Sequence, residues 1–339
     1  MQQRLGRVML ADGTGVAYAV VGGGRPLVYV MGWLTHLELS WEFPAERALY
    51  EALAQGCRFV RYDRAGCGLS MFTVRPPSLA FELEQLAAVV STLETDSFDL
   101  MGTSLGAPVA VAWAAAHPET VRRLVLYGGW ARGADVSPSA VQAHLLGLIE
   151  SHWGLGSDVL TNIFAPDLDS STRDTFGRYQ REASSAATAR ALLAMSYELD
   201  VTDLLSKVQA PTLVVHRAHD RAAPATQAKV LADGIPASEL VTLAGRSHLP
   251  YVGDRDALVR VVRRFLGLPA TRLRADLLTA RQREVASLVS QGCTNREIAT
   301  RLGIGERSAE GHVERIRMRL GFRSRAQIAA WYTVQHNKF

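Results

Sequence analysis

The sequence has 339 residues, of which 48% are hydrophobic and 21% are charged. This composition is typical of a globular protein with a sizeable core, and the length favours two domains. The three cysteines, Cys57, Cys67 and Cys293, are scattered and form no C-x-x-C pair, which argues against a disulfide framework and against a zinc site. The first residues contain no apolar run of signal-peptide length, so we expect a cytoplasmic protein that does not associate with membranes.

Charge is divided unevenly along the chain. Residues 270–339 carry 13 Lys and Arg against 6 Asp and Glu, whereas residues 1–269 carry 24 against 27. A near-neutral body with a small basic end favours nucleic-acid binding by that end, although a solvated basic helix has a similar composition.

Short apolar strands alternate with helices through most of the chain. Residues 7–10 and 16–21 flank an Asp12-Gly13 turn and predict a hairpin. Further strands are expected at 27–31, 57–62, 98–101, 124–127, 212–216 and 240–243, and helices at 45–54, 81–93, 108–116 and 254–266. This alternation predicts an α/β domain with a doubly wound, mostly parallel sheet, in which ligands bind beyond the carboxyl ends of the strands.

The alternation stops between about residues 131 and 206, where the pattern is helical. An insertion at this place would cover the strand ends as a cap, although a purely structural helical insert fits the same pattern. We place the end of this first domain at residue 268, a linker at 269–274 and a second, helical domain at 275–339.

A candidate nucleophile lies between the strand at 98–101 and the helix at 108–116. Residues 102–106 are Gly-Thr-Ser-Leu-Gly, which matches the G-x-S-x-G nucleophile elbow. A serine on so sharp a strand-to-helix turn needs flanking residues without side chains, so that the backbone can reverse and expose the hydroxyl. The pattern therefore indicates Ser104 as the nucleophile.

Two later strands are each followed by a candidate partner for Ser104. Asp220 follows the strand at 212–216, and His248 follows the strand at 240–243. His248 would take the proton of Ser104, and Asp220 would orient the imidazole and stabilise its charged form. The backbone N–H groups of Leu105 and Trp33 are the expected oxyanion hole. The alternative is that His248 is an ordinary loop histidine and Asp220 a turn residue.

Across residues 1–268 the sequence resembles the α/β-hydrolase superfamily, through the segments MGW, DRAGCGLS, GTSLG, HD and SH. The resemblance implies a serine hydrolase, and it is weakest at Met31, where many members carry a histidine. His36, Trp41 and Trp130 are candidates to line an apolar pocket, although each by itself fits an ordinary core or surface position.

The basic end carries a second, independent pattern. Three pairs fit the S/T-x-x-E/Q capping box and predict helix starts, namely Thr279 with Gln282, Thr294 with Glu297, and Ser324 with Gln327. A fourth helix is expected from about residue 306 to 320, after Gly303-Ile304-Gly305. Four short helices with tight turns predict a helix-turn-helix domain.

Helical spacing divides the helix at 306–320 into two faces. Ala309, Val313, Ile316 and Leu320 share the face expected to pack inward. The opposite face would enter a major groove, where arginines reach guanine or phosphate and glutamates accept from cytosine; it carries Arg307, Gly311, Glu314, Arg315 and Met318, with Glu310 at its margin. The best candidates for phosphate contacts are Arg296, Arg301, Arg319, Arg323 and Arg325. A small helical bundle with a solvated charged face is the alternative.

Residues 278–331 resemble the LuxR-type helix-turn-helix over nearly the whole motif, with residues 295–314 as the helix-turn-helix proper. The resemblance implies a homodimer on double-stranded DNA, and it places Asn295, Arg296, Ser308 and His312 among the contact residues. Ser308-Ala309 stands where Thr-Val is usual in that family, and Glu310 and Glu314 occupy positions that are often basic.

The two resemblances together predict a transcriptional regulator whose first domain senses a small apolar ester or lactone. No cofactor and no metal is expected. Three mechanisms stay open: the triad only cradles the ligand, slow hydrolysis or acylation of Ser104 is part of the switch, or the protein is an esterase whose second domain tethers or autoregulates it.

Overall fold

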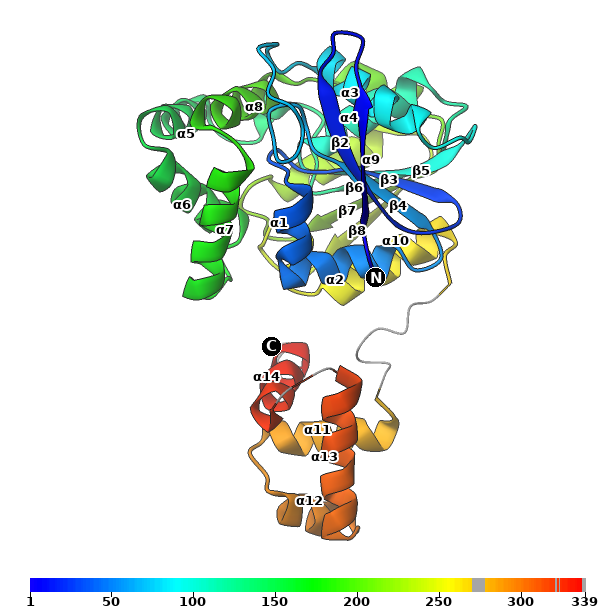
Figure 1. Ribbon diagram of the computed structural model, residues 1–339, viewed down its shortest axis with the longest axis vertical. Helices are drawn as coiled ribbons and strands as arrows, with labels where there is room; N and C mark the ends of the chain where they lie inside the picture. Colours follow the sequence, from blue (N-terminus) through cyan, green and yellow to red (C-terminus); the bar gives the residue numbers. More distant parts are fainter. Residues whose placement is uncertain (270–277, 321, 323, 337–339) are drawn as a thin grey trace. The chain divides into compact units, whose positions relative to one another are not determined.

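The computed structural model describes residues 1–269, 278–320, 322 and 324–336. The chain divides into two compact units, Met1–Ala270 and Thr271–Phe339 (Figure 1). Of the predicted linker at 269–274, all but Pro269 lies outside the described residues. No helix in the described part of the chain is long and apolar enough to cross a membrane.

The first unit is built on one eight-stranded sheet with the strand order β1-β2-β4-β3-β5-β6-β7-β8. The pairs β1–β2 and β2–β4 are antiparallel, and all other neighbours are parallel, as the alternating pattern predicted. The strands are β1 (Arg4–Met9), β2 (Gly15–Gly22), β3 (Pro26–Val30), β4 (Arg58–Tyr62), β5 (Phe98–Thr103), β6 (Val121–Tyr127), β7 (Thr212–Arg217) and β8 (Ser238–Leu243).

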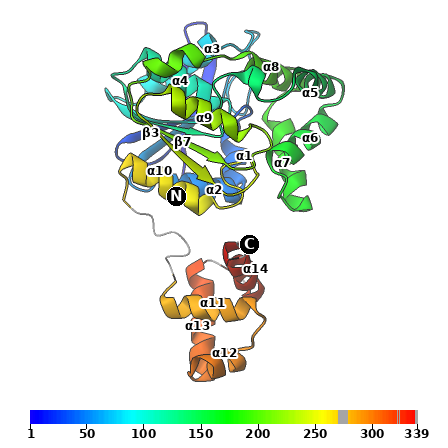
Figure 2. The same cartoon turned by 180° about the vertical axis from the view of Figure 1, so that it is seen from behind.

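Helices cover both faces of the sheet (Figures 1 and 2). One face carries α2 (Pro44–Leu53) and α10 (Arg255–Leu266); the other carries α3 (Leu79–Ser91), α4 (Gly106–Ala116) and α9 (Ala225–Gly234). The whole of β5 is buried, and so are the first nine residues of α4. Because α4 is apolar on all sides and β5 is buried along its whole length, both pack in the centre of the unit, and the turn between them is fixed by the core on either side.

Four α-helices form most of the segment between β6 and β7, namely α5 (Ser139–Ser151), α6 (Trp153–Phe164), α7 (Ser170–Ala183) and α8 (Ala186–Glu198). Two short 3-10 helices, Gly133–Asp135 and Thr202–Lys207, flank them. The side chains of His152, Asp169 and Ser185 cap the N-termini of α6, α7 and α8. Buried residues of this segment, such as Ile149 and Leu192, share one apolar cluster with Trp33, Leu105 and Trp130. The helical segment therefore packs over the carboxyl end of the sheet.

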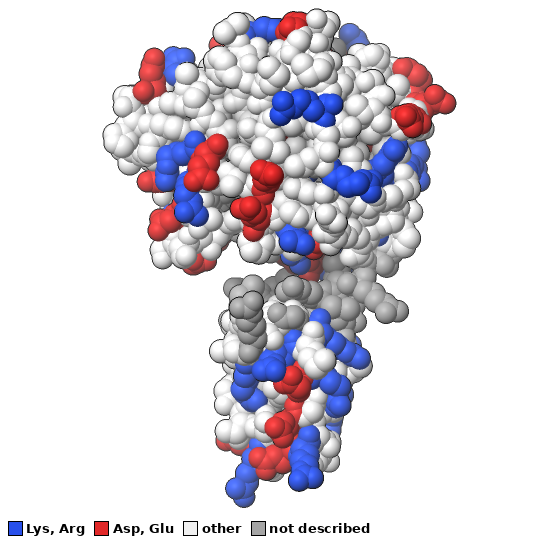
Figure 3. Space-filling model, viewed as in Figure 1, with Lys and Arg blue, Asp and Glu red and all other residues white. Residues whose placement is uncertain are grey.

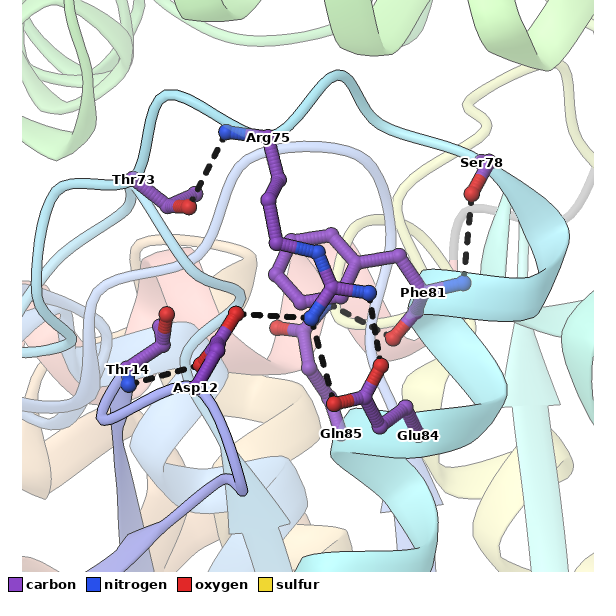
Figure 4. A network of polar contacts seen from close by, with 8 residues as sticks. All are labelled: Asp12, Thr14, Thr73, Arg75, Ser78, Phe81, Glu84 and Gln85. Carbon is purple, nitrogen blue, oxygen red and sulfur yellow. Dashed lines mark hydrogen bonds and ion pairs between the residues drawn. The ribbon is translucent and has the colours of Figure 1, made fainter.

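Arg75 fixes the loop that leads into α3 (Figure 4). Its guanidinium lies 2.7 Å from a carboxylate oxygen of Asp12, in the β1–β2 turn, and 2.6 Å from one of Glu84, in α3. It also lies 3.9 Å from the ring centroid of Phe81. These contacts tie the loop to two neighbouring elements at the surface of the unit.

The second unit consists of α11 (Ala280–Ser290), α12 (Asn295–Leu302), α13 (Glu306–Leu320) and α14 (Arg325–His336). Reciprocal capping-box hydrogen bonds form at Thr279 and Thr294; at Ser324 the two bonds to Gln327 measure 3.2 and 3.3 Å. The apolar core of this unit includes Ala309, Ile316 and Leu320 of α13, as the helical spacing predicted; Val313 is half-buried and packs against this core.

The sequence pattern missed two helices of the first unit. Helix α1 (Leu37–Glu42) has six residues and begins at His36, whose Nδ1 accepts a hydrogen bond from the backbone of Leu39. Helix α9 lies between Asp220 and β8. Both are short, and few apolar residues mark their buried faces.

Candidate active site and nucleic-acid interface

The turn between β5 and α4 holds Ser104 in a strained backbone conformation. Its φ is +55°, a region that side-chain-bearing residues rarely occupy. A Cβ atom at Gly102 would overlap the carbonyl of Gly106, and one at Gly106 would overlap the carbonyl of Val30. The two glycines are thus required by close backbone approach, and the reversal they permit carries the Ser104 side chain out beyond the strand end.

The structure brings Ser104, His248 and Asp220 together. In the sequence, Ser104 and His248 are 144 positions apart, and Asp220 and His248 are 28 positions apart. His248 Nε2 lies 2.8 Å from Ser104 Oγ, and His248 Nδ1 lies 2.8 Å from Asp220 Oδ2. The side chains of His248 and Asp220 are only 5% and 1% exposed. This is the geometry of a nucleophile, a base and an acid that orients the base.

Electrostatic surroundings keep Asp220 ionised. Burial acts to raise the pKa of this carboxyl, but the charge and hydrogen bond of His248, with help from His216 and the Ala222 N–H, hold it below its usual value. Asp220 Oδ1 accepts from the N–H groups of Ala222 and Ala223 at 2.8 and 3.2 Å. An ionised, immobile carboxylate fixes the imidazole tautomer that leaves Nε2 free to accept a proton.

The loop after β3 lies beside the serine. A Cβ atom built on Gly32 would be 3.6 Å from Ser104 Cβ. Within the described residues, no hydrogen-bond acceptor is assigned to the backbone N–H of Trp33 or of Leu105. These are the two donors that the sequence predicted for an oxyanion hole, and both residues are buried.

Arg64 holds the Trp33 N–H in its orientation. Its guanidinium donates to the carbonyls of Gly32 and Met31, the latter at 2.8 Å. Because a trans peptide directs its C=O and N–H in opposite directions, the Gly32 carbonyl on Arg64 points the Trp33 N–H away from Arg64. Glu82 pairs with Arg64 at 2.8 Å, and both side chains are almost fully buried. This buried pair therefore braces the loop.

Two cavities meet at the serine, and both are lined by Trp33, Ser104, Phe164 and His248. The larger, which we call the apolar cavity, has a volume of about 140 Å³ and extends under α5, α6 and α8, between Trp130, Leu145 and Leu160. The smaller has a volume of about 60 Å³, and most of its lining is also apolar. We call it the polar cavity after Glu46 and Gln180, towards which it extends.

Two of the three predicted pocket residues lie elsewhere. Trp130 lines the apolar cavity. His36 instead caps helix α1, and Trp41 lies on that helix with the guanidinium of Arg47 4.9 Å from its ring centroid; neither is among the residues that line the two cavities. Both residues lie at α1, a helix that the sequence pattern did not predict.

The cap segment also holds the catalytic loop. The backbone carbonyl of Phe164, the last residue of α6, accepts from the His248 N–H at 2.7 Å and from Ser247 Oγ at 3.1 Å. The Phe164 ring lies 5.8 Å from the His248 imidazole. Phe164 therefore positions the histidine and lines both cavities.

On the second unit, most of the predicted DNA contacts are exposed. Figure 3 shows basic side chains around a smaller group of acidic ones on the visible face. Met318 is 73% exposed, and the exposed polar candidates include Arg296, Arg307, Ser308, Glu310, Glu314 and Arg315. Gly311 and His312 are half-buried on α13. Glu314 accepts from Arg317 at 2.8 Å on the same helix.

Other candidates on this unit are engaged within it. Asn295 accepts from Arg325 at 2.7 Å, and Arg319 donates to Gln282 of α11 at 2.8 Å. Arg301 is exposed and donates to Gln291 at 3.2 Å. The expected phosphate contact Arg323 lies outside the described residues.

Three residues near the serine were missed by the sequence analysis. Arg64 lies inside the DRAGCGLS segment, and the presence of an arginine within that motif was the available signal. Glu46 and Gln180 lie on α2 and α7, and nothing in their local sequence marks them. In the described part of the chain, no group of three or more His, Cys, Asp or Glu side chains could hold a metal ion.

The strand order, the elbow and the hydrogen-bonded triad define the first unit as an α/β-hydrolase fold, and the second unit is a helix-turn-helix domain. Residues 22–261 match the alpha/beta hydrolase family, and residues 276–332 match the bacterial regulatory proteins of the luxR family. The chain belongs to the alpha/beta hydrolase family and carries a LuxR-family DNA-binding domain after it.

Individual relatives resemble the hydrolase part. The chain is 27% identical over 257 residues to pyrrolizixenacetamide deacetylase of Xenorhabdus hominickii, covering 74% of this chain and 94% of that protein. It is 29% identical over 206 residues to a pimeloyl-[acyl-carrier protein] methyl ester esterase of Neisseria meningitidis, covering 56% and 78%. A crystal structure of a hydrolase from Pseudomonas aeruginosa superposes with a TM-score of 0.68 at 25% identity, covering 78% and 98%.

Proposed function

We propose that the hydrolase unit binds and slowly cleaves a small apolar ester or lactone, and that the state of this ligand controls DNA binding by the second unit. The observation that carries the proposal is the hydrogen-bonded chain Asp220–His248–Ser104 at the junction of two cavities. The chain that holds this site also carries a LuxR-family DNA-binding domain.

The chemistry follows from the positions of these groups. Ser104 Oγ attacks the carbonyl carbon of the ester while His248 Nε2 takes the hydroxyl proton, and the N–H groups of Leu105 and Trp33 bind the resulting oxyanion. The tetrahedral intermediate collapses to an acyl-Ser104, and His248 returns the proton to the leaving alcohol. Water then attacks the acyl group with His248 as base, releasing the acid. The deacetylase and esterase relatives support hydrolysis of an acyl bond.

The apolar cavity supports the ligand class. Its wall combines Trp33, Trp130, Leu145 and Leu160 with few polar groups, and such a surface gains free energy by covering an apolar chain. Because α5, α6 and α8 supply eight of the 17 residues that line this cavity, a ligand in it contacts the cap directly. Movement of the cap with the ligand is the proposed source of the signal.

On the second unit, we propose that α13 enters the major groove. Arg307 and Arg315 are exposed on it and would contact guanine or phosphate, with Arg296 of α12 on the backbone. The LuxR-family domain supports a homodimer on a two-fold DNA site. Sedimentation of the full chain with operator DNA tests this directly: one chain bound to a single half-site would contradict the dimer.

The test of the regulatory proposal measures DNA affinity and ester hydrolysis with the same proteins. The wild type, Ser104→Ala and the exposed control Ser91→Ala are titrated against DNA from upstream of the gene, with and without p-nitrophenyl hexanoate. We expect hydrolysis by the wild type and Ser91→Ala only, and an ester-dependent shift of DNA affinity in all three. Hydrolysis with no shift in any protein would contradict the sensor and favour the second candidate, an esterase tethered to DNA, which the complete triad geometry supports.

A further inference from the structure

The polar cavity ends at a carboxyl group that the proposed hydrolysis does not use. Glu46, in the first turn of α2, lines this cavity together with Ser104 and is only 6% exposed. Among the described residues, no Lys, Arg or His forms an ion pair with it, and Arg61 instead donates to Ser40, Gln3 and the Leu37 carbonyl. A buried carboxyl without a cationic partner is costly when ionised.

One oxygen of the Glu46 carboxyl accepts a hydrogen bond from a tyrosine. The Tyr50 hydroxyl donates to Glu46 Oε1 at 2.5 Å. Burial raises the pKa of Glu46 to about 7, against the lowering effects of Tyr50, Arg61 and Tyr251. The neutral form therefore predominates below neutral pH, and it has a proton to donate. Five titratable or charged side chains face Glu46. They are Tyr29 of β3, Arg61 of β4, Tyr50 of α2, Tyr179 of α7, and Tyr251 in the loop after His248.

A second polar group lines the same cavity with an unused acceptor. Gln180 of α7 is fully buried. Its Nε2 donates to the Ser157 carbonyl at 3.0 Å and to Thr161 Oγ1 at 2.7 Å, which fixes the orientation of the amide. Its Oε1 has no hydrogen-bond partner. A buried acceptor of this kind costs free energy until a donor reaches it.

We propose that Glu46 and Gln180 bind a hydroxyl group of the ligand, so that the substrate is a hydroxy-ester with a short hydroxylated arm and a longer apolar arm. A hydroxyl both donates and accepts, so it can donate to Gln180 Oε1 while it accepts from Glu46. The volumes agree with this division, because about 60 Å³ of polar cavity accommodates only a short arm and about 140 Å³ of apolar cavity takes the longer one. This inference rests on the proposed ester ligand at Ser104.

The test compares esters that differ only in a hydroxyl for a methyl group. One pair is hexyl 3-hydroxypropanoate and hexyl butanoate, and the other is 2-hydroxyethyl hexanoate and propyl hexanoate, so that either the acyl or the alcohol arm carries the hydroxyl. Binding is measured by calorimetry on full-length Ser104→Ala protein, which keeps both esters intact. We expect the hydroxylated member of at least one pair to bind at least about tenfold more tightly, since its methyl analogue leaves Gln180 unpaired.

Variants added to Ser104→Ala separate recognition from a structural role. Glu46→Met and Gln180→Met should each lower the hydroxyl preference to less than about threefold, because each removes one hydrogen bond. Glu46→Gln should retain it, since its amide donates as the neutral carboxyl does. The matched control is Glu42→Met, an exposed carboxylate of α1, which should leave the preference as in the parent protein.

The outcomes are distinct. Equal binding of the hydroxylated ester and its methyl analogue in both pairs would overturn the inference. An aminoethyl ester that binds more tightly than its hydroxyethyl counterpart would also overturn it, because an ammonium requires ionised Glu46. Hydrolysis of hexyl butanoate and propyl hexanoate by the wild type is measured separately and reports on the proposed function. It can fail or succeed independently of the preference for a hydroxylated ester.

Discussion

The two units of the chain place their candidate functional residues in opposite surroundings. In the hydrolase unit, Asp220 and His248 are buried and bonded on several sides. In the DNA-binding unit, Arg307 and Arg315 are exposed on one face of α13. The first set of side chains is held by contacts within the protein, whereas the second is exposed to solvent. A substitution in the first should affect geometry and catalysis, and one in the second should affect affinity for DNA alone.

The largest expected effect is on the buried triad. Ser104→Ala should lower the hydrolysis of p-nitrophenyl butyrate by at least about a thousandfold, because the nucleophile is lost while binding is retained. The measurement is kcat/KM for the wild type, Ser104→Ala and the matched control Ser91→Ala. A rate within tenfold of the wild type would show that the elbow is not the catalytic centre.

The second largest effect is expected at Arg64, which donates to two carbonyls of the loop after β3. Arg64→Lys keeps the charge but cannot reach Glu82 and the two loop carbonyls together. We expect kcat to fall by about 10- to 100-fold with KM nearly unchanged, since a misdirected Trp33 N–H stabilises the transition state less. The surface arginine of the Asp12–Glu84 network supplies the control, Arg75→Lys. A change confined to KM would mean that Arg64 shapes the pocket instead.

On the exposed side of the comparison, Arg307→Ala and Arg315→Ala should each weaken operator binding by about 1–3 kcal/mol. Ester hydrolysis should stay at the wild-type rate in both, because the substitutions lie in the other unit. Fluorescence anisotropy with labelled operator measures the affinity, and the exposed Arg260→Ala of α10 is the control. If both variants bind as tightly as this control, α13 does not contact the DNA in the proposed way.

Counted per pH unit, the smallest effect is the one on the stability of the fold. The pKa of Glu46 is raised to about 7, above its usual 4.5, so the folded chain holds this proton more tightly than the unfolded one. The resulting stabilisation is present below pH 4.5 and is lost as pH rises through 7, with a slope of about 1 kcal/mol per pH unit in that window. The free energy of unfolding, measured in urea at several pH values, should lack this part of the slope in Glu46→Gln. The same dependence of that free energy on pH in the wild type and in Glu46→Gln would contradict the prediction.

The same contrast explains what could be predicted from sequence. The order Ser104, Asp220, His248 follows strand ends, and strand ends meet at one edge of a parallel sheet, so these positions could be inferred from local patterns. The arginines of α13 could be assigned to a face by helical spacing alone. Glu46 and Gln180 line one cavity only because α2 and α7 pack around it, and no local pattern encodes that arrangement. His36 and Trp41 lie at α1, a six-residue helix that no clear apolar pattern marks.

The central claim is that ligand turnover at Ser104 sets the duration of a DNA-binding signal. The most direct measurement adds one aliquot of p-nitrophenyl hexanoate to protein on labelled operator and follows anisotropy with time, for the wild type and for Ser104→Ala. The account predicts a shift that decays in the wild type as the ester is consumed and persists in Ser104→Ala. An anisotropy trace that never responds to the ester in either protein, while the wild type hydrolyses it, would contradict the claim.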